Sequence, residues 1–270
     1  MITSTIATHT PLSPRVLPKW GNGVKSVWRR NFLHFRYTFW VTLCWIFVEP
    51  LLFLLAIGYG IGNFVSDING KSYIDFYFPA LLSITAFSVP FFESTYNYYS
   101  KLTHQKIYQT ILMTPVSVGE ILWAELLWGA SKGLLSCFAV SIVARVLNIY
   151  HSWLILPVFF VLFLISFIGS ACGLLFTTFA KNYDFFNYAI SGFLLPMSFF
   201  SDSYFPINQL PSIIQIIIHF FPLIHGVKAV RLLLDGTSNS TLYFSIFILM
   251  IFALALTRWV YLRFLKLILD

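Results

Sequence analysis

Charge is scarce in this sequence. Asp, Glu, Lys and Arg make up 10% of its 270 residues, whereas a soluble globular domain carries roughly 25%. Apolar residues make up 58% and the mean hydropathy is +0.80, so the chain has too few charges to cover a surface that faces water. This composition excludes intrinsic disorder, argues against a soluble enzyme and predicts an integral membrane protein.

Cysteine pairs and catalytic motifs are also missing. Cys44, Cys137 and Cys172 lie singly in apolar runs, so neither a metal knuckle nor a redox pair is indicated. No H-E-x-x-H or G-x-S-x-G motif occurs, and His219 and His225 alone provide too few ligands for a metal site. We therefore expect no catalytic, cofactor or metal site in this chain.

A complete phosphate-binding loop and a signal peptide are absent as well. Asn69-Gly70-Lys71-Ser72 resembles the end of a phosphate loop, but that loop requires a second glycine where Val65 stands. We interpret the stretch as a turn and expect no nucleotide site here. Residues 1–36 lack the apolar core of a signal peptide, and residues 1–19 are expected to form a flexible tail.

Long apolar runs take the place of these motifs. A helix of about 20 apolar residues is long enough to cross a bilayer. Six spans are predicted, at residues 37–61, 76–98, 121–147, 153–179, 185–200 and 242–262. A further run at 205–221 is shorter and favours a re-entrant or interfacial hairpin, with a seventh span as the alternative. Three prolines bound it: Pro206, Pro211 and Pro222.

Basic residues flank the predicted spans unevenly. Six lie before the first span with no acidic residue among them, and three near the C-terminus outnumber Asp270. The loop after the first span, with Asp67, Lys71 and Asp75, is net acidic. An excess of Lys and Arg marks the cytoplasmic side, so both termini are predicted to be cytoplasmic, which requires an even number of spans. We attribute the net charge of +7 to the basic residues of cytoplasmic segments rather than to nucleic-acid binding.

Residues 20–36 are neither a span nor a simple tail. Aromatic and aliphatic residues recur at helical spacing among basic ones, and the segment includes Trp20, Trp28, Arg29 and Arg30. A basic amphipathic helix with Trp on its apolar face lies in the membrane interface. We predict such a helix here, with a merely basic tail as the alternative.

Charges inside the predicted spans are costly and therefore informative. Glu49 lies midway along the first span, directly before Pro50, and proline kinks a helix. We interpret Glu49 as facing another helix or a dimer interface, either as a pathway or gating residue or as a structural carboxylate. Glu125 and Lys132 lie two turns apart on one face of the third span, too far apart to pair directly. Lys132 is deeper and is expected to have a partner.

The loop at 100–120 is the most structured of the predicted loops. Thr114-Pro115 interrupts it, and Ser117 with Glu120 three residues later predicts a capping box that opens the third span. A short ordered segment between two spans is suited to dock onto a soluble partner, whereas a plain connecting loop is the alternative. The residues expected to form this segment are Lys101, Lys106, Ile111, Leu112, Met113, Pro115 and Glu120.

Together these stretches resemble the membrane subunits of type-2 ABC transporters and, among them, the permeases of lipooligosaccharide (nodulation-factor) exporters. The similarity covers about residues 20–265. It is carried by VWRRN at 27–31, EPL at 49–51 with glycines at 58, 60 and 62, NGKSYI at 69–74, FESTY at 92–96, GEI at 119–121 with Lys132, and FPINQLP at 205–211 with Pro222-Leu223.

The resemblance implies an all-α transmembrane domain at 37–265 with six spans, an interfacial helix at 20–36 and a cytoplasmic end at 266–270. It also implies a coupling segment between the second and third spans and a re-entrant helical hairpin before the last. It further implies a homodimer in the bacterial inner membrane, served by two copies of a cognate ATPase subunit that binds ATP and Mg²⁺. The chain itself would then be no enzyme, and the cargo would be an amphipathic substrate such as a lipid-linked saccharide or polysaccharide.

Two other functions stay open on the sequence. An ion-coupled secondary transporter would use Glu49 and Lys132 as a charge relay, although such transporters usually carry internal repeats and none is evident here. A membrane transferase would need paired acids or histidines at the interface, where only Glu93, Glu120 and Glu125 are candidates.

Overall fold

The computed structural model describes residues 22–269 apart from 63, 66–67, 69 and 151–153, and these residues form helices and their connections without a named strand. Trp20 of the predicted interfacial helix therefore lies outside the described residues. In chain order the helices are α1 (Asn22–Tyr37), α2 (Phe39–Phe53), the π-helix η1 (Leu54–Ile61), α3 (Tyr73–Phe92), the π-helices η2 (Glu93–Asn97) and η3 (Ser100–His104), α4 (Ile107–Leu112), α5 (Val118–Val146), α6 (Ile155–Phe179), α7 (Asp184–Ala189), the π-helix η4 (Ile190–Leu194), α8 (Leu195–Phe199), the 3₁₀-helix η5 (Ile207–Gln209), α9 (Ser212–Ile218), α10 (Pro222–Leu234) and α11 (Ser240–Leu269).

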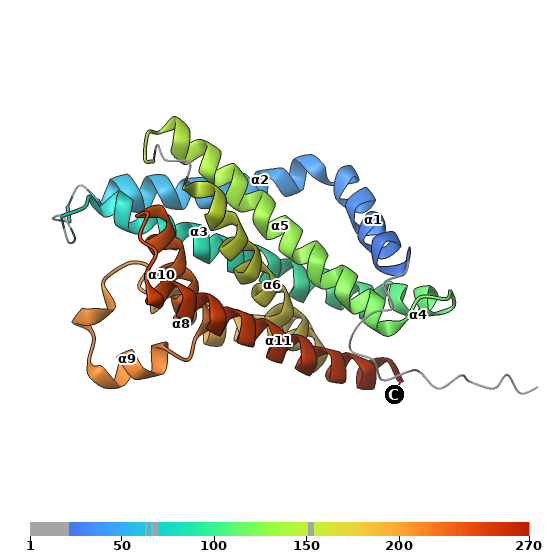
Figure 1. The fold of residues 1–270 in the computed structure, drawn as a ribbon. Helices are drawn as coiled ribbons and strands as arrows, with labels where there is room; N and C mark the ends of the chain where they lie inside the picture. The colour runs from blue at the N-terminus through green and yellow to red at the C-terminus, as the bar shows by residue number, and fades with distance from the viewer. Residues whose placement is uncertain (1–21, 63, 66–67, 69, 151–153, 270) are drawn as a thin grey trace, which may run out of the picture.

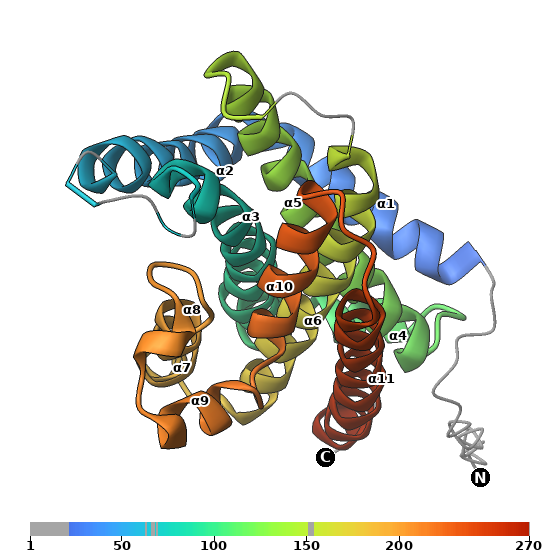
Figure 2. The same cartoon turned by 60° about the vertical axis from the view of Figure 1, so that its left-hand side comes forward.

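The molecule is an elongated bundle with two distinct ends (Figure 1). One end carries α1, α4 and the end of α11, and we call it the α4 end. The other end carries α9, α10 and the connection from η1 to α3, and we call it the α9 end. Figures 1 and 2 show α9 at the edge of the bundle rather than among the long helices.

Five helical segments among the described residues are long and apolar enough to cross a membrane: Phe39–Ile61, Tyr73–His104, Val118–Val146, Ile155–Phe179 and Ser240–Leu267. They overlap five of the six predicted spans. The other, at 185–200, is a helical run of 6, 5 and 5 residues in α7, η4 and α8. At 1.5 Å per residue this run is about 24 Å long, shorter than a hydrocarbon core of about 30 Å. The exact number of crossings therefore stays a prediction.

The predicted hairpin region contains two short helices that meet at a sharp angle. The axes of α9 and α10 differ by 88°, and only the two together are long enough to cross. Pro211 directly precedes α9, and Pro222 begins α10, as expected for a residue that lacks a backbone N–H and suits the first turn of a helix. Pro206 stands in the same way before η5.

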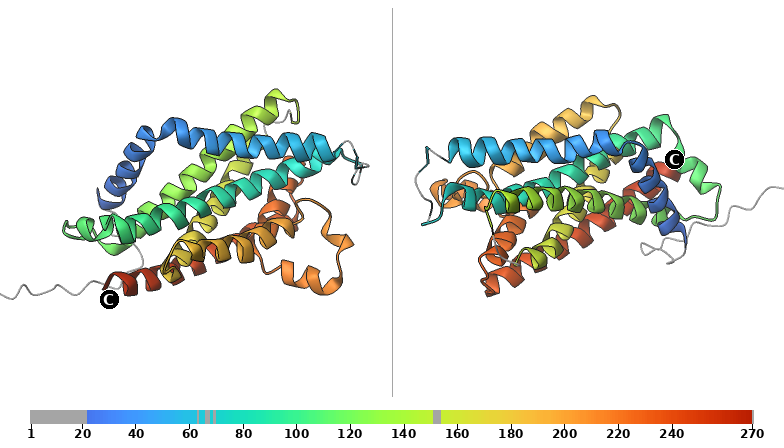
Figure 3. Two further views of the ribbon diagram at one scale, coloured as in Figure 1. Left: turned by 180° about the vertical axis from the view of Figure 1, so that it is seen from behind. Right: turned by 90° about the horizontal axis from the view of Figure 1, so that it is seen from above.

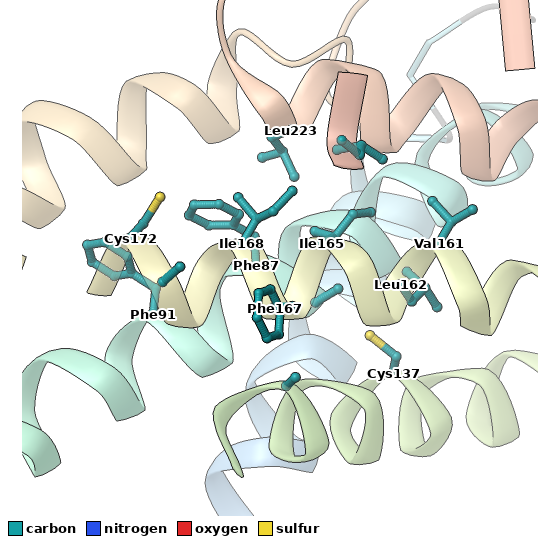
Figure 4. Close-up of a cluster of buried hydrophobic side chains, with 14 of the residues drawn as sticks. Phe87, Phe91, Cys137, Val161, Leu162, Ile165, Phe167, Ile168, Cys172 and Leu223 are labelled. Atoms are coloured by element: carbon teal, nitrogen blue, oxygen red, sulfur yellow. The ribbon is translucent and has the colours of Figure 1, made fainter. Parts of the chain in front are cut away.

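The core is centred on α6, which packs against α3, α5, α10 and α11. In Figure 4, Phe87 and Phe91 of α3, Cys137 of α5 and Leu223 of α10 surround the side chains of α6. Within their most apolar stretches, 78% of the α6 residues are buried in the chain, against 20% in the segment that includes α2. The two segments therefore have different surroundings. The other helices of this chain enclose α6, whereas most of the segment that includes α2 is exposed on the outside of the bundle.

Glycines bring the core helices close together. A Cβ atom at Gly169 of α6 would lie 2.4 Å from the carbonyl oxygen of Phe87, and one at Gly173 would lie 2.6 Å from that of Phe91. Two glycines of α5 approach serines of α6 in the same way. Small residues four apart allow such contact between membrane helices, so the α3–α5–α6 packing depends on these positions.

The helix α2 lies on the flank of the bundle beside α3 and α5 (Figure 3). It continues through Pro50 as far as Phe53, and the wider π-helix η1 follows directly. Proline removes a hydrogen bond from the interior of a helix, and π-segments occur where the regular ladder is interrupted. The helix thus changes type four residues after Pro50, and the kink expected at Pro50 stays a prediction.

Candidate functional site: a buried charge cluster at the α4 end

One carboxylate holds the α4 end together. Glu125 of α5 is fully buried. Its oxygens accept hydrogen bonds from the Asn31 amide at 2.8 Å and the Tyr108 hydroxyl at 3.2 Å. They also form ion pairs with Lys101 at 2.9 Å and Arg30 at 3.2 Å. Partners from α1, η3 and α4 therefore meet at a single group on α5.

The partners of Glu125 are themselves fixed. The Tyr98 hydroxyl donates to the backbone oxygen of Glu125. The Lys101 ammonium lies 4.5 Å from the centre of the Tyr98 ring and donates to the Asn31 side chain at 3.2 Å. Burial, and then the negative charge of Glu125, raise the pKa of Tyr108 well above its usual range, so its hydroxyl stays a donor. A buried carboxylate is tolerated only when it is paired and hydrogen-bonded, and here four side chains meet that need.

A second pair lies further along α5. The Lys132 ammonium is 2.7 Å from a Glu93 oxygen, and both side chains are about nine-tenths buried. Glu93 also accepts from the Trp128 indole at 3.1 Å and from the Asn97 amide. The expectation that Lys132 has a partner is confirmed, and Glu125 and Lys132 do not pair with each other, as their spacing predicts.

The helix α1 packs on α5 through one of its faces. Val27, Asn31 and Phe35 are its buried residues, four positions apart, which places them on one helical face. Trp28 meets Trp128 edge-to-face with 5.7 Å between ring centres and donates to Ser131 of α5 at 3.4 Å. Arg30 turns inward to Glu125, whereas Arg29 is exposed.

The start of α5 carries the predicted capping box. Ser117 receives the Glu120 backbone N–H at 3.3 Å, and Glu120 receives the Ser117 N–H at 2.9 Å. A Cβ atom at Gly23 of α1 would lie 2.6 Å from the Glu120 carboxylate. Glu120 is therefore buried under α1 and holds the start of α5, so it is not part of an exposed surface.

The segment 100–120 presents only some of its expected docking residues. Lys101 is buried against Glu125 and does not face outward, which corrects the expectation that it meets an acidic surface on a partner. Ile111 and Leu112 are half-buried against the core. Of the expected docking residues, Lys106, Met113, which is 87% exposed, and Pro115 face outward. Lys106 has a left-handed backbone with φ +49°, and this turns the chain from η3 into α4.

Glu49 faces a cavity. It is exposed on α2 and, among the described residues, makes no hydrogen bond or ion pair. It lines a cavity of about 580 Å³ together with Glu93 and Lys132, and an adjoining hollow of about 490 Å³ that includes Cys44. Glu49 lies across this cavity from α3 and α5 residues, so its expected role at an interface with another helix or with a second copy stays a prediction.

The sequence did not predict that Glu125 is the centre of a charge cluster, or that Asn31 and Tyr108 bind it. A carboxylate within an apolar span indicates that a partner exists, but periodicity does not say which segment supplies it. No group of three or more His, Cys, Asp or Glu side chains suited to a metal ion occurs in the part of the chain that the structure describes.

Comparisons with known proteins place this arrangement in a family. The profile described as ABC-2 type transporter matches residues 22–234. The chain belongs to the ABC-2 type transporter family. This confirms the resemblance to type-2 ABC permeases and selects the transporter subunit among the three functions that the sequence left open.

Similar proteins cover most of the chain. Nodulation protein J of Rhizobium meliloti is 30% identical over 222 residues, 82% of this chain and 84% of that protein. Nodulation protein J of Bradyrhizobium diazoefficiens is 31% identical over 231 residues, with 84% and 88% covered. The inner membrane transport permease YadH of Escherichia coli is 23% identical over 238 residues, with 86% and 90% covered. This chain is thus an ABC-2 permease subunit similar to nodulation protein J.

Proposed function

We propose that this chain is the membrane subunit of an ATP-driven exporter in a bacterial inner membrane. Two copies form the pathway, and two copies of a cognate ATPase subunit bind ATP and Mg²⁺. The cargo is an amphipathic substrate such as a lipid-linked saccharide or polysaccharide. The family match and the names of the relatives, nodulation protein J and an inner membrane transport permease, support this proposal.

Six spans with both termini in the cytoplasm fit the basic ends of the chain. The α4 end then faces the cytoplasm with α1 as an interfacial helix, and the run from α7 to α8 is the fifth crossing. The helices α9 and α10 form a re-entrant hairpin on the outer side, in keeping with their 88° bend. Reporter fusions should place residues 1 and 270 inside and the loop at Asp67 outside; termini on opposite sides would contradict the topology.

The observation that carries the function is the convergence on Glu125. The chain has to receive energy by contact with its ATPase, and the exposed side of the segment 100–120 is a suitable place for that contact. Behind this surface, Lys101 and Tyr108 bind the same carboxylate as Arg30 of α1. A displacement of α4 is therefore transmitted to α5 and α1 together, as a rigid-body movement of packed helices.

A pair of glutamate substitutions tests this docking. Lys106→Glu and Met113→Glu change exposed groups of the segment, whereas Lys266→Glu changes an exposed lysine on α11 and serves as the matched control. We expect Lys106→Glu with Met113→Glu to abolish pull-down of the ATPase and vesicle transport while membrane insertion stays normal. Unchanged pull-down and transport would mean that docking uses another surface, such as the exposed side of α1.

Glu49 supports a dimer that uses α2. A charged carboxylate facing lipid costs about 2.5–3.5 kcal/mol on insertion scales, and a second copy over the hollow beside Glu49 would remove that cost. Cys44 lines the same hollow, whereas Cys137 and Cys172 are buried. We expect a bismaleimide to join two copies through Cys44 and Cys44→Ser to prevent this; absence of a cross-link in a dimeric sample would place the interface elsewhere.

A further inference from the structure

A second polar cavity lies at the α9 end, far from the charge cluster. Its volume is about 470 Å³, within the range of about 300–1,000 Å³ found for small-molecule sites. Its walls come from the connection before α3, the start of α3, the turn after α8, η5, α9 and α10. Its charged residues are Lys71, Asp75, Asp202, Lys228, Arg231 and Asp235.

One wall of this cavity is held in place by Arg231. Its guanidinium pairs with Asp202 and donates to the Phe76 backbone oxygen at 3.3 Å, and it lies 4.2 Å from the centre of the Phe76 ring. Asp202 also accepts the Ile207 backbone N–H at 2.9 Å. These contacts tie α10 to α3 and to the turn before η5, so the cavity is formed before any ligand arrives.

Several donors on the wall are left over. Among the described residues, the Asn208 side chain makes no hydrogen bond, and the Lys228 ammonium contacts His219 at 3.1 Å without an ion pair to a carboxylate. The Nε atom of Arg231 is buried and has no hydrogen-bond partner. Lys71, in contrast, is paired with Asp235. Buried polar groups are normally satisfied, so the Nε atom of Arg231 indicates a bound partner. The exposed Asn208 side chain and the half-exposed Lys228 ammonium line the same cavity and are available to that partner.

The charges of the residues that line the cavity indicate which chemical class of ligand it binds. Three basic and three acidic residues line the cavity, so their formal charges cancel. An anion would meet three carboxylates and a cation three basic groups. A neutral, hydroxyl-rich molecule both donates and accepts hydrogen bonds, as this mixed wall does. The apolar residues Ile68, Pro206 and Ile207 add contacts for C–H groups.

We propose that this cavity binds one or two neutral sugar units of the exported substrate as they reach the outer side. The inference rests on the proposed export function, because it takes the saccharide from that substrate and the outer side from that topology. It assigns the hairpin helices α9 and α10 a binding role in addition to their place in the fold.

The test uses the permease–ATPase complex in lipid nanodiscs and cellobiose that carries a photoreactive diazirine. We expect the label on peptides of α9 and α10, and we expect unlabelled cellobiose to compete. Asn208→Ala with Lys228→Met removes two donor side chains from the cavity wall and should lower labelling about tenfold, the equivalent of about 1.4 kcal/mol. The matched control, Gln209→Ala with Lys266→Met, changes the same kinds of side chain outside the cavity.

Labelling elsewhere, or labelling that the cavity variants leave unchanged, would overturn the proposal. Displacement by inorganic phosphate but not by cellobiose would also overturn it, because the cavity would then be an anion site. ATPase association is measured on the same samples. A complex that forms and hydrolyses ATP while its cavity stays unlabelled contradicts this inference alone, whereas loss of the ATPase contradicts the proposed function whatever the labelling shows.

Discussion

The two ends of the bundle both carry charge but place it in different surroundings. At the α4 end, Glu125 and Glu93 are buried and paired: Glu125 binds groups from α1, η3 and α4, and Glu93 binds Lys132 and Trp128 of α5. At the α9 end, the pairs Lys71–Asp235 and Arg231–Asp202 line a cavity that keeps unused donors. The Glu125 and Glu93 carboxylates are fully paired, although the Nη1 atom of Arg30 is buried without a hydrogen-bond partner. Buried carboxylates paired in this way fix helices relative to one another, whereas a cavity wall with available donors is suited to binding. The first arrangement fits transmission of movement and the second fits recognition.

The largest loss of stability is expected from removal of the Glu125 carboxylate. Glu125→Ala leaves Arg30 and Lys101 near a buried site without their carboxylate, and breaking a buried ion pair costs about 3–5 kcal/mol. We expect a loss of this size in the free energy of unfolding, measured by denaturant titration in mixed micelles. Asp235→Ala, which breaks a partly exposed pair at the other end, serves as the control. Equal losses in both variants would remove the distinction between the two ends.

An intermediate effect is expected at the second buried pair. Lys132→Met and Glu93→Gln should each destabilise the protein because each leaves the other charge buried. The double variant should lose less than the sum of the two by about 1–3 kcal/mol, since neighbouring residues in one network are coupled. Additive losses in this double-mutant cycle would show that the 2.7 Å contact carries no interaction energy.

The smallest change in the free energy of unfolding is expected from the ion pair at the α9 end. The side chains of Lys71 and Asp235 are 46% and 34% exposed, and exposed ion pairs contribute about 0–1 kcal/mol. Lys71→Met should therefore change the free energy of unfolding by no more than about 1 kcal/mol. A loss above about 2 kcal/mol would give this pair the same structural weight as the buried ones.

Much of the membrane architecture could be predicted because length and hydropathy determine it locally. Five long apolar segments, the helix at 22–37 and the capping box at Ser117 and Glu120 follow from patterns within a few turns of chain. The inward direction of Lys101 could not be read in that way. Its partner Glu125 is 24 positions away on another helix, and Arg30 and Asn31 are further still, so only tertiary packing brings them together.

The short run at residues 184–199 shows a second limit. Its composition predicts a span, whereas its length falls below what a straight crossing needs. The exposed position of Glu49 shows a third limit of prediction from sequence. A charged group in a span indicates that it has an interaction partner, but the pattern does not say whether a neighbouring helix or a second copy of the chain supplies that partner.

The most direct test of the account asks whether α1 and α4 move as one body. Spin labels at Lys25→Cys of α1 and Gln109→Cys of α4, both exposed positions, are placed in a chain without its three native cysteines and assembled with the ATPase. Electron–electron distances are measured without nucleotide and with trapped ATP. We predict that the distance between the two copies of position 109 changes while the distance from position 25 to position 109 within one copy stays constant. A change in that second distance would contradict transmission through the Glu125 cluster.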